Sequence, residues 1–394
     1  MISVSEAKEF IRKNSNPLTP VQAALALAAG KTLAEDIVAP IDIPAYPQSS
    51  MDGYALLFKD WKASGELDLF GEIAAGRGDQ IELPKGKAVR IFTGAPVPPG
   101  ADTVVMQEKC RVEDDQVIIE DPLLKTGDNV RPTGSEISKG ALALEKGTLL
   151  TPAAIGFLAG IGLTEISIYP SPKVSIIVTG NELQTPGNPL SYGQVYESNS
   201  LSLKAALEQL SIPLPIVYRV EDQLDALAKT LAHCLENSDI VLLTGGISVG
   251  DYDFTLKAAM LCEVETIFHK IRQKPGKPIL FARKGKKLVF GLPGNPASVL
   301  TCFYEYVLEA ICILQNSPIT LHQQFVPLAG PYKKPAGITH FLKGLLLGET
   351  VLSLDGQESY KLNSFAKANC LIVIPENSTE CQAGDLVEIH RLPI

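Results

Sequence analysis

The sequence of 394 residues lacks three features that would each define a class of protein. It has no charge-free apolar run of 18 residues, so a membrane span is not expected. The first residues, MISVSEAKEFIRKN, lack the apolar centre of a signal peptide and have the pattern of an amphipathic helix, which predicts a cytoplasmic protein. The seven cysteines include no CxxC pair, which argues against a disulfide framework and a structural zinc site.

Positive charge is also scarce. Lysine and arginine number 35 against 44 aspartates and glutamates, and the formal net charge is −9. A general nucleic-acid surface is therefore not expected, and an anionic ligand would need a local cluster of cations. No Ser-His-Asp or Cys-His set is visible around the five histidines, which disfavours covalent catalysis and a histidine general base. The length predicts two to four domains.

Short β-branched runs alternate with helical patterns between residues 173 and 315. The runs are VSIIV, IVYRV, DIVLL and LVFGL, and each is followed by a segment with helical spacing. Apolar strands that alternate with helices predict a parallel sheet covered on both faces. We therefore expect a doubly wound α/β domain over residues 171–322.

The rest of the chain favours strands. Runs such as AVRIF and TVVMQ predict a small β-rich domain over residues 44–130. If the flanking segments 1–43 and 131–170 pack together, this β-rich domain is an insertion. Residues 323–394 contain HFLKGLLLG, CLIVIPE and DLVEIHRL, which predict a β-barrel or a sandwich.

Three glycine turns follow strands of the predicted α/β domain. They are TGNEL (179–183), TGGISVGDYD (244–253) and LPGNPAS (292–298). Ligands of doubly wound sheets bind beyond the carboxyl ends of the strands, where backbone N–H groups and helix dipoles favour anions. Three turns at one edge predict a site for a ligand with several negative charges, and the alternative is a set of ordinary turns and caps.

The LPGNPAS turn has a structural interpretation of its own. Asn295 is expected to cap a helix that begins with Pro296, and Pro293 would stiffen the entry. A phosphate contact at this turn would be an addition to the cap.

The segment RQKPGKP gathers Arg272, Lys274 and Lys277 around a Pro-Gly turn. It could clamp a phosphate or another oxyanion. The alternative is a solvated hairpin turn like the nearby ARKGKK. We favour the clamp, because prolines stiffen the first segment and not the second.

Acidic residues follow the same strands. Asp222 could cap the next helix or act at the site, and one of Asp251 and Asp253 should be a cap. Glu182 stands inside the TGNEL turn, where its charge would oppose phosphate. Magnesium would reconcile these charges, because it bridges carboxylates to phosphate or oxyanion oxygens.

Two motifs of the β-rich region could also contribute. QSSMDGYAL (48–56) places Asp52 before Tyr54, and RIFTGAPVPPGADTVVMQE (90–108) contains a Thr-Gly-Ala turn. Each could be no more than a turn.

Together these motifs resemble the molybdopterin molybdenumtransferase family, known as MoeA in bacteria and as the E domain of gephyrin in animals. SMDGYA, RIFTGAPVPPGADTVVMQE, RPTGSEI, VTGNEL, TGGISVGDYD, KPGKP, GLPGNPAS and ANCLIVIPE stand in the family's order. The resemblance covers nearly the whole chain. It implies an elongated linking domain (1–43 and 131–170), an inserted β-rich domain (44–130), a molybdopterin-binding α/β domain (171–322) and a C-terminal β-barrel (323–394).

The resemblance also implies an activity. Adenylylated molybdopterin and molybdate would give molybdenum cofactor and AMP with the help of Mg²⁺. The protein would be a homodimer whose active cleft forms between subunits. Molybdopterin adenylyltransferase and molybdoenzyme chaperones would be candidate partners, with neither nucleic acid nor membrane involved.

Individual roles follow from the matching motifs. The resemblance implies catalytic roles for Asp52, Thr93, Glu182, Asp222, Lys274 and Lys277. It implies metal binding by Glu182, Asp222 and Asp253. It implies substrate binding by Gly245, Gly246, Ser248, Pro293, Gly294, Asn295, Pro296 and Ser364.

The last domain departs from the family pattern. GITHFLKG has Ile338 where the family commonly has arginine, His340 in place of glutamate, and Lys343 in place of arginine. The family's Ser-Gly loop reads QESYKLNSFAKAN, which leaves Ser364 as the best match to a substrate-linked serine. These changes could alter the choice of metal oxyanion. Two other functions stay open, a molybdopterin adenylyltransferase and a scaffold protein with an inherited pocket.

Overall fold

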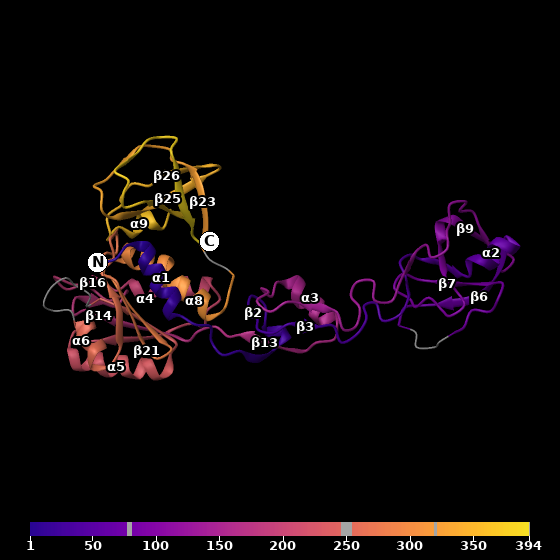
Figure 1. The fold of residues 1–394 in the computed structure, drawn as a ribbon, viewed down its shortest axis with the longest axis horizontal. Helices are drawn as coiled ribbons and strands as arrows, with labels where there is room; N and C mark the ends of the chain where they lie inside the picture. Colours follow the sequence, from indigo (N-terminus) through magenta and orange to yellow (C-terminus); the bar gives the residue numbers. More distant parts are fainter. Residues whose placement is uncertain (77–80, 246–253, 319–320, 394) are drawn as a thin grey trace. The chain divides into compact units, whose positions relative to one another are not determined.

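The structure is a computed structural model that describes residues 1–76, 81–245, 254–318 and 321–393. Its internal contacts divide the chain into two compact units (Figure 1). Unit 1 comprises Met1–Val21, Gly30–Ala34 and Ser167–Ile394, and unit 2 comprises Gln22–Ala29 and Glu35–Ile166. Each unit has sheets and apolar cores of its own. The finer division into four domains stays a prediction.

A six-stranded sheet forms the centre of the α/β domain in unit 1. The strand order is β17-β14-β18-β22-β21-β19. The bounds are β14 Val174–Thr179, β17 Ile216–Val220, β18 Ile240–Thr244, β19 Glu265–His269, β21 Leu280–Lys284 and β22 Lys287–Leu292. The first four strands in this order are parallel, as predicted. The edge differs from the prediction, because a two-residue turn joins β21 to β22 and therefore makes that pair antiparallel.

Helices cover both faces of this sheet (Figure 1). Side chains alternate along a strand, so Ile176 of β14 enters one core and Ile177 enters the other. The first core includes residues of α1 (Val4–Asn14), α4 (Asn199–Gln209), α7 (Pro296–Cys302), η3 (Phe303–Val307) and α8 (Leu308–Leu314). The second includes residues of α5 (Leu224–Asn237) and α6 (Phe254–Leu261). This arrangement confirms an α/β domain with two covered faces.

Two helical segments need separate mention. Within the described part of the chain, Pro296–Leu314 is the one helix long and apolar enough to cross a membrane, but 83% of its apolar window is buried, so it serves as a core helix. Residues 1–21, which we grouped with the linking domain, belong to unit 1. Ala7 and Ile11 of α1 lie in the first core of the α/β domain, which explains the amphipathic pattern of this helix.

The C-terminal part of unit 1 is a sheet folded round its own core. Its strands are β23 His322–Pro327, β25 Thr339–Leu347, β26 Thr350–Ser353, β27 Cys370–Ile374 and β29 Leu386–Arg391. They pair in the order β26-β25-β27-β29-β23, and a bridge between Leu328 and Val351 returns the circuit to β26, in a barrel-like arrangement. Beside it lie β24 (Tyr332–Lys333), α9 (Leu362–Phe365) and β28 (Glu380–Cys381).

One short strand joins this sheet to the α/β domain. β20 (Gln273–Lys274) lies in the RQKPGKP segment and pairs in parallel with β25. Lys274 thereby comes opposite His340. The register brings the predicted anion clamp next to the segment that departs from the family pattern.

Unit 2 is built on a second six-stranded sheet with the order β8-β5-β7-β6-β10-β9. Its strands are β5 Gly53–Leu56, β6 Glu66–Ile73, β7 Lys87–Ile91, β8 Thr103–Met106, β9 Cys110–Glu113 and β10 Gln116–Ile119, with α2 Phe58–Ser64 and η2 Gln107–Lys109 beside them. The two flanks of this sheet pair with each other, β3 (Ile37–Val38) with β12 (Leu142–Leu144) and β4 (Gln48–Ser49) with β11 (Val130–Arg131). The β-rich region is therefore inserted between paired flanks.

The remaining short elements complete the chain. They are β1 (Val21–Ala24), η1 (Leu25–Leu27), β2 (Thr32–Leu33), α3 (Pro152–Gly160), β13 (Glu165–Tyr169), β15 (Leu183–Gln184) and β16 (Val195–Tyr196).

Candidate functional site

A cavity of about 480 Å³, here called the lysine cavity, lies between the α/β domain and the C-terminal sheet. It is lined by Gln273, Lys274, Pro275, Gly276, Lys277, Pro278, Pro293, Gly294, Asn295, Ser298, Ile338, Gln357 and Ser359. The predicted KPGKP and PGNP turns therefore meet in one place. Lys274 and Lys277 are exposed, and neither ammonium forms an ion pair within the described residues. The cavity can accept an anion through these two groups.

Buried contacts hold the KPGKP turn in shape. The side-chain amide of Gln273 donates to the carbonyl of Pro275 at 2.9 Å, and the Tyr306 hydroxyl donates to the Gln273 side chain. Gly276 has φ +83°, and a Cβ there would lie 2.5 Å from the sulfur of Cys302, so glycine is required. The buried contacts fix the conformation of the turn, and its two lysines remain exposed. This combination favours the clamp interpretation.

The alternative for this turn was a solvated hairpin like ARKGKK. In ARKGKK, Lys284 and Lys287 are neutralised by Glu263 at 3.4 Å and Asp239 at 3.3 Å. Arg272 does not join the clamp, since its Nε donates to Glu376 at 3.2 Å and it is absent from the cavity wall.

The PGNP turn differs from its prediction in one respect. Asn295 does occupy the N-cap position of α7 and Pro296 begins the helix, but the Asn295 side chain makes no capping hydrogen bond. Its amide instead donates to the Ser359 hydroxyl at 2.8 Å. The backbone N–H of Ala297 donates to the Ser359 carbonyl at 3.1 Å. The C-terminal domain thus supplies the acceptor that a cap would supply.

Ser359 is a residue that the sequence analysis missed. It lines the lysine cavity, whereas the Ser364 hydroxyl is buried and donates to the Gly356 carbonyl at 2.8 Å. Ser364 lines a separate cavity together with Asp355 and Lys361. Both serines stand in QESYKLNSFAKAN, and the sequence alone does not distinguish which of them lines the lysine cavity.

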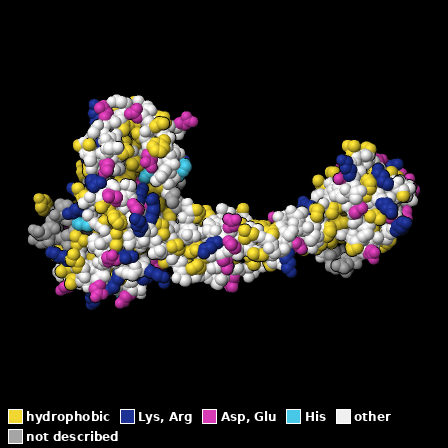
Figure 2. Space-filling model, in the orientation of Figure 1, with side chains coloured by type: hydrophobic (Ala, Val, Ile, Leu, Met, Phe, Trp, Pro, Cys, Tyr) yellow, Lys and Arg dark blue, Asp and Glu magenta, His cyan; other side chains and the backbone are white. Residues whose placement is uncertain are grey.

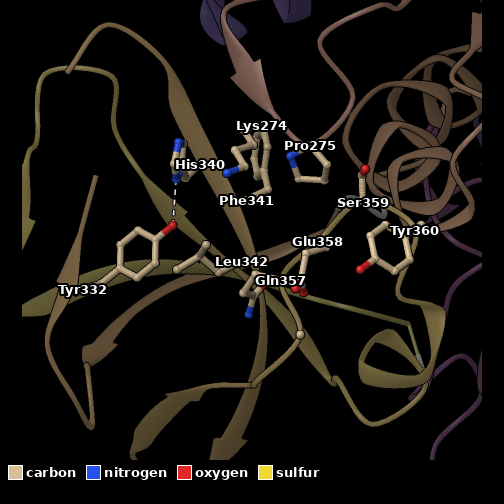
Figure 3. Close-up of a pocket in the computed structure, with 11 residues that line it drawn as sticks. Lys274, Pro275, Tyr332, His340, Phe341, Leu342, Gln357, Glu358, Ser359 and Tyr360 are labelled. Atoms are coloured by element: carbon tan, nitrogen blue, oxygen red, sulfur yellow. Dashed lines mark hydrogen bonds between the residues drawn. The ribbon is translucent and has the colours of Figure 1, made fainter. Parts of the chain in front are cut away.

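A second cavity of about 530 Å³, here called the aromatic cavity, adjoins the first (Figure 3). It is lined by Lys274, Pro275, Tyr332, His340, Phe341, Leu342, Gly356, Gln357, Glu358, Ser359 and Tyr360. Lys274, Pro275, Gln357 and Ser359 line both cavities. Lys274 therefore stands at their shared border.

His340 is the neutral neighbour of Lys274. Its Nδ1 is hydrogen-bonded to the Tyr332 hydroxyl at 2.7 Å, as Figure 3 shows. Burial lowers the pKa of His340 to about 4, and the charges of Lys274 and Lys334 act in the same direction. The ring is therefore uncharged at neutral pH and adds no second positive charge beside the Lys274 ammonium.

Lys343 shapes the loop that carries Gln357, Glu358 and Ser359. Its ammonium is buried and donates to the carbonyls of Gly356 at 2.5 Å, Lys361 at 3.0 Å and Glu358 at 3.2 Å. These bonds use all three of its donors. Lys343 therefore fixes this loop and is absent from the walls of both cavities.

The glycine turns at the carboxyl ends of β14 and β18 touch each other. Gly245 has φ +86°, and a Cβ there would lie 1.9 Å from the Thr179 carbonyl oxygen, so a side chain is excluded. The predicted residues Gly246, Ser248 and Asp253, and also Asp251, lie outside the described residues.

Asp222 reaches this edge of the sheet. Its carboxylate accepts a hydrogen bond from the Thr179 hydroxyl at 3.2 Å, and its N–H donates to the Asn181 side chain at 3.4 Å. The helix that it was expected to cap begins at Leu224 with Gln223 in the N-cap position. The cap alternative for Asp222 was therefore wrong.

A metal would depend on two carboxylates in this region. In the part of the chain that the structure describes, no group of three or more histidines, cysteines, aspartates or glutamates is placed to hold a metal ion. Glu182 and Asp222 follow the adjacent strands β14 and β17. Mg²⁺ is often bound by one or two protein carboxylates together with phosphate oxygens and waters, so the carboxylates at this edge are of the type that the ion takes.

Asp52 and Thr93 form a pair in unit 2. One carboxylate oxygen of Asp52 accepts from the Thr93 N–H at 2.7 Å and from the Thr93 hydroxyl at 2.8 Å. The Thr93 backbone bond, then its hydroxyl and the Arg90 charge, lower the pKa of Asp52. A Cβ on Gly53 would lie 1.9 Å from the Val105 carbonyl oxygen, which explains the glycine of MDGY. The structure thus joins two predicted residues in an exposed, ionised carboxylate site.

The surface carries mixed charge. On the face seen in Figure 2, basic and acidic side chains are interspersed in both units. This pattern agrees with a local anion site and a net charge of −9.

Family models match three consecutive parts of the chain. Residues 2–162 match a model described as the MoeA N-terminal region (domain I and II). Residues 175–313 match a probable molybdopterin binding domain, and residues 326–392 match the MoeA C-terminal region (domain IV). The lysine cavity lies between the parts that match the second and the third model.

Similar proteins match over nearly their full length. A molybdopterin molybdenumtransferase of Haemophilus influenzae is 36% identical over 370 residues, which cover 92% of this chain and 91% of that protein. Molybdopterin molybdenumtransferase 2 of Mycobacterium tuberculosis is 31% identical, with 100% of both chains covered. The crystal structure of a molybdopterin biosynthesis MoeA protein from Pyrococcus horikoshii aligns with a TM-score of 0.86 at 28% identity, and covers 100% of this chain and 99% of that one.

Proposed function

Because the chain belongs to the MoeA family of molybdopterin molybdenumtransferases, we propose that it inserts molybdenum into molybdopterin during molybdenum cofactor biosynthesis. The substrates are adenylylated molybdopterin and molybdate, and the products are molybdenum cofactor and AMP. The two dithiolene thiols displace an oxide of molybdate as water, and water cleaves the phosphoanhydride bond, so that the phosphate stays on the pterin and AMP leaves. The protein acts as a Mg²⁺-dependent transferase.

The lysine cavity is the observation that carries this proposal. Molybdate and the phosphates of the pterin substrate are all anions, and they repel one another when they share a site. One pair of unit charges 4 Å apart interacts with about 4 kcal/mol at an effective dielectric constant of 20. Lys274 and Lys277 offset this repulsion because they are exposed at the cavity and form no ion pair within the described residues. Catalysis is then mainly positional and electrostatic.

The acidic residues have a separate task. We assign Glu182 and Asp222 to Mg²⁺, which when bound would withdraw charge from the phosphates. Thr179 orients the Asp222 carboxylate through its hydroxyl, and the turn at Gly245 keeps the backbone of two strands in contact at this edge. Asp52 and Thr93 supply an ionised carboxylate from unit 2.

A second candidate function is a molybdopterin adenylyltransferase, which would need the α/β domain. The match of residues 326–392 to the MoeA C-terminal region disfavours it, because that region contributes Ile338, Gln357 and Ser359 to the lysine cavity.

An assay of AMP release tests the function. Purified protein is mixed with adenylylated molybdopterin, Mg²⁺ and molybdate, and AMP is followed over time. We expect AMP release that depends on molybdate. If no AMP forms, and the protein instead adenylylates free molybdopterin with ATP, the transferase proposal is wrong.

Matched lysine variants test the cavity in the same assay. Lys274→Ala and Lys277→Ala should each lower kcat/KM for molybdate by about tenfold or more, because a charge-assisted hydrogen bond contributes about 1.5–3 kcal/mol. Lys286→Ala is the control, since Lys286 is exposed on the ARKGKK turn outside both cavities. If all three variants are equally active, the lysine cavity takes no part in the reaction.

A further inference from the structure

We propose that the aromatic cavity is a subsite for the flat pterin ring of the substrate, and that the adjoining lysine cavity takes the anionic end. This inference rests on the proposed function, since it concerns the same substrate. It assigns Tyr360 and Glu358 as determinants of pterin specificity.

The walls of the aromatic cavity suit a flat ring. Tyr332 and Tyr360 lie on opposite sides of the group drawn in Figure 3, and His340 and Leu342 lie between them in the view. Tyr360 is 61% exposed, so its ring is available to a ligand rather than packed in a core. Aromatic side chains favour stacked or edge-to-face contacts with other rings. A planar heterocycle can therefore bind against Tyr360.

Two charged groups fit the edges of a pterin. A pterin has an amino group beside a ring N–H, and a carbonyl oxygen next to that N–H. A carboxylate such as Glu358 can accept both N–H groups together, as it accepts the two parallel bonds of arginine. An ammonium such as Lys274 can donate to the carbonyl. Glu358 and Lys274 both line the cavity, so one ring could meet both.

The Glu358 carboxylate can accept further hydrogen bonds from such a ligand. Its carboxylate accepts one hydrogen bond from Lys361 at 3.0 Å, and its side chain is 49% exposed. A carboxylate offers about four acceptor positions, so further donors can bind. The hydrogen bond from Lys361 lowers the pKa of Glu358, which is therefore ionised at neutral pH.

The two cavities allow one ligand to span both. They share Lys274, Pro275, Gln357 and Ser359, so the two cavities adjoin at these four residues. The loop between them is preformed, since Lys343 donates to three of its carbonyls and the Gln357 amide donates to the Leu354 carbonyl at 2.8 Å. A ligand with a ring at one end and phosphate at the other fits this arrangement.

Equilibrium binding tests the subsite without any turnover. The probes are molybdopterin and the shorter pterin-6-carboxylate, and quenching of pterin fluorescence reports binding. Tyr360→Ala and Glu358→Gln should each weaken both probes by about tenfold, since each removes one strong contact. Tyr360→Phe keeps the ring and should bind as the wild type does. Glu349→Gln changes an exposed glutamate on the turn between β25 and β26 and is the matched control.

The results separate the subsite from the proposed function. KM for molybdate should stay unchanged in Tyr360→Ala and Glu358→Gln, which shows that the lysine cavity is intact. If both variants bind the two probes as tightly as the wild type, or if the wild type binds neither probe, the subsite is overturned. If the wild type binds the pterin probes but releases no AMP, the proposed function fails and the subsite stands.

Discussion

Asp52 illustrates how one residue is prepared for a charged role. Its carboxylate is exposed, yet the N–H and hydroxyl of Thr93 both bind the same oxygen. These bonds fix the side chain and, together with Arg90, lower its pKa, so it stays ionised at neutral pH. Both hydrogen bonds come from one residue, so within the described residues the Asp52 carboxylate is hydrogen-bonded to the turn at Thr93 alone.

We expect Asp52→Ala to abolish molybdate-dependent AMP release and to leave the fold intact. Loss of an oriented charge at a transition state lowers kcat by about 10²–10³-fold. Steady-state kinetics measure the loss, and circular dichroism with thermal unfolding checks the fold. Asp68→Ala is the control, because Asp68 is also an exposed carboxylate of unit 2 and pairs with Lys87 at 2.9 Å. Normal activity of Asp52→Ala would exclude this residue from the site.

Residue-scale prediction from the sequence succeeded where a motif fixes the backbone. The KPGKP lysines and the PGNP turn lie together because glycine and proline determine both turns. Prediction from the sequence failed where the hydrogen-bond partner of a residue comes from an element distant in the sequence. Asn295 was expected to cap its own helix, but Ser359 takes its hydrogen bond from 64 positions away, and no local pattern encodes that contact.

At the scale of elements, a buried ionic cluster joins three parts of unit 1. Glu305 lies in η3 with its side chain fully buried. Lys8 of α1 binds it at 2.8 Å, and His390 of β29 binds it at 2.7 Å. Glu388 contacts the other ring nitrogen of His390 at 3.1 Å. A buried carboxylate of this kind is stable only while its partners remain in place.

This cluster predicts a pH dependence of stability. Burial lowers the pKa of His390, but Glu305 and Glu388 raise it by more, so its net pKa lies above the ordinary value. A raised pKa contributes stability that is complete below the ordinary value near 6.5 and is lost as the pH rises through the folded value. We expect His390→Gln to lower the free energy of unfolding by about 2 kcal/mol at pH 6 and by less at pH 9.

Urea unfolding at the two pH values, followed by circular dichroism, measures this difference. His322→Gln is the control, because His322 is exposed on the neighbouring strand β23. A loss of stability in His390→Gln that is the same at pH 6 and pH 9 would contradict the charged His390–Glu305 pair.

The elements themselves followed from hydrophobic patterning, with two informative exceptions. The apolar runs of the sequence predicted the four parallel strands correctly. A strand that is buried on both faces, as β14 and β18 are, needs apolar residues at nearly every position. The antiparallel edge was not predicted for the sheet, although the two-residue turn at 285–286 lies in ARKGKK, a segment that we interpreted as a hairpin turn. We grouped helix α1 with the linking domain, whereas it packs on the core of the α/β domain. Its apolar stripe predicts a packed helix but does not indicate which surface the helix packs against.

At the scale of the whole molecule, the predicted site residues are divided between the two units. The motifs assign Asp52 and Thr93 to unit 2, and Lys274, Lys277, Glu182 and Asp222 to unit 1. The resemblance identified the family because eight motifs in order constrain the whole chain. How two copies combine depends on surfaces without such motifs, so the dimer stays a proposal.

Mixed subunits test the proposed homodimer and its shared cleft. Asp52→Ala and Lys274→Ala should each lose most of the wild-type activity when tested alone, because each removes one side of every site. If the cleft forms between subunits, a mixed dimer contains one intact site and one with both substitutions. Random mixing of the two variants should then restore roughly a quarter of the wild-type activity per subunit, since half of the dimers are mixed. Analytical ultracentrifugation should show a dimer at micromolar concentration, and each variant mixed with itself is the control. A fully active monomer, or a mixed dimer without activity, would contradict the shared cleft.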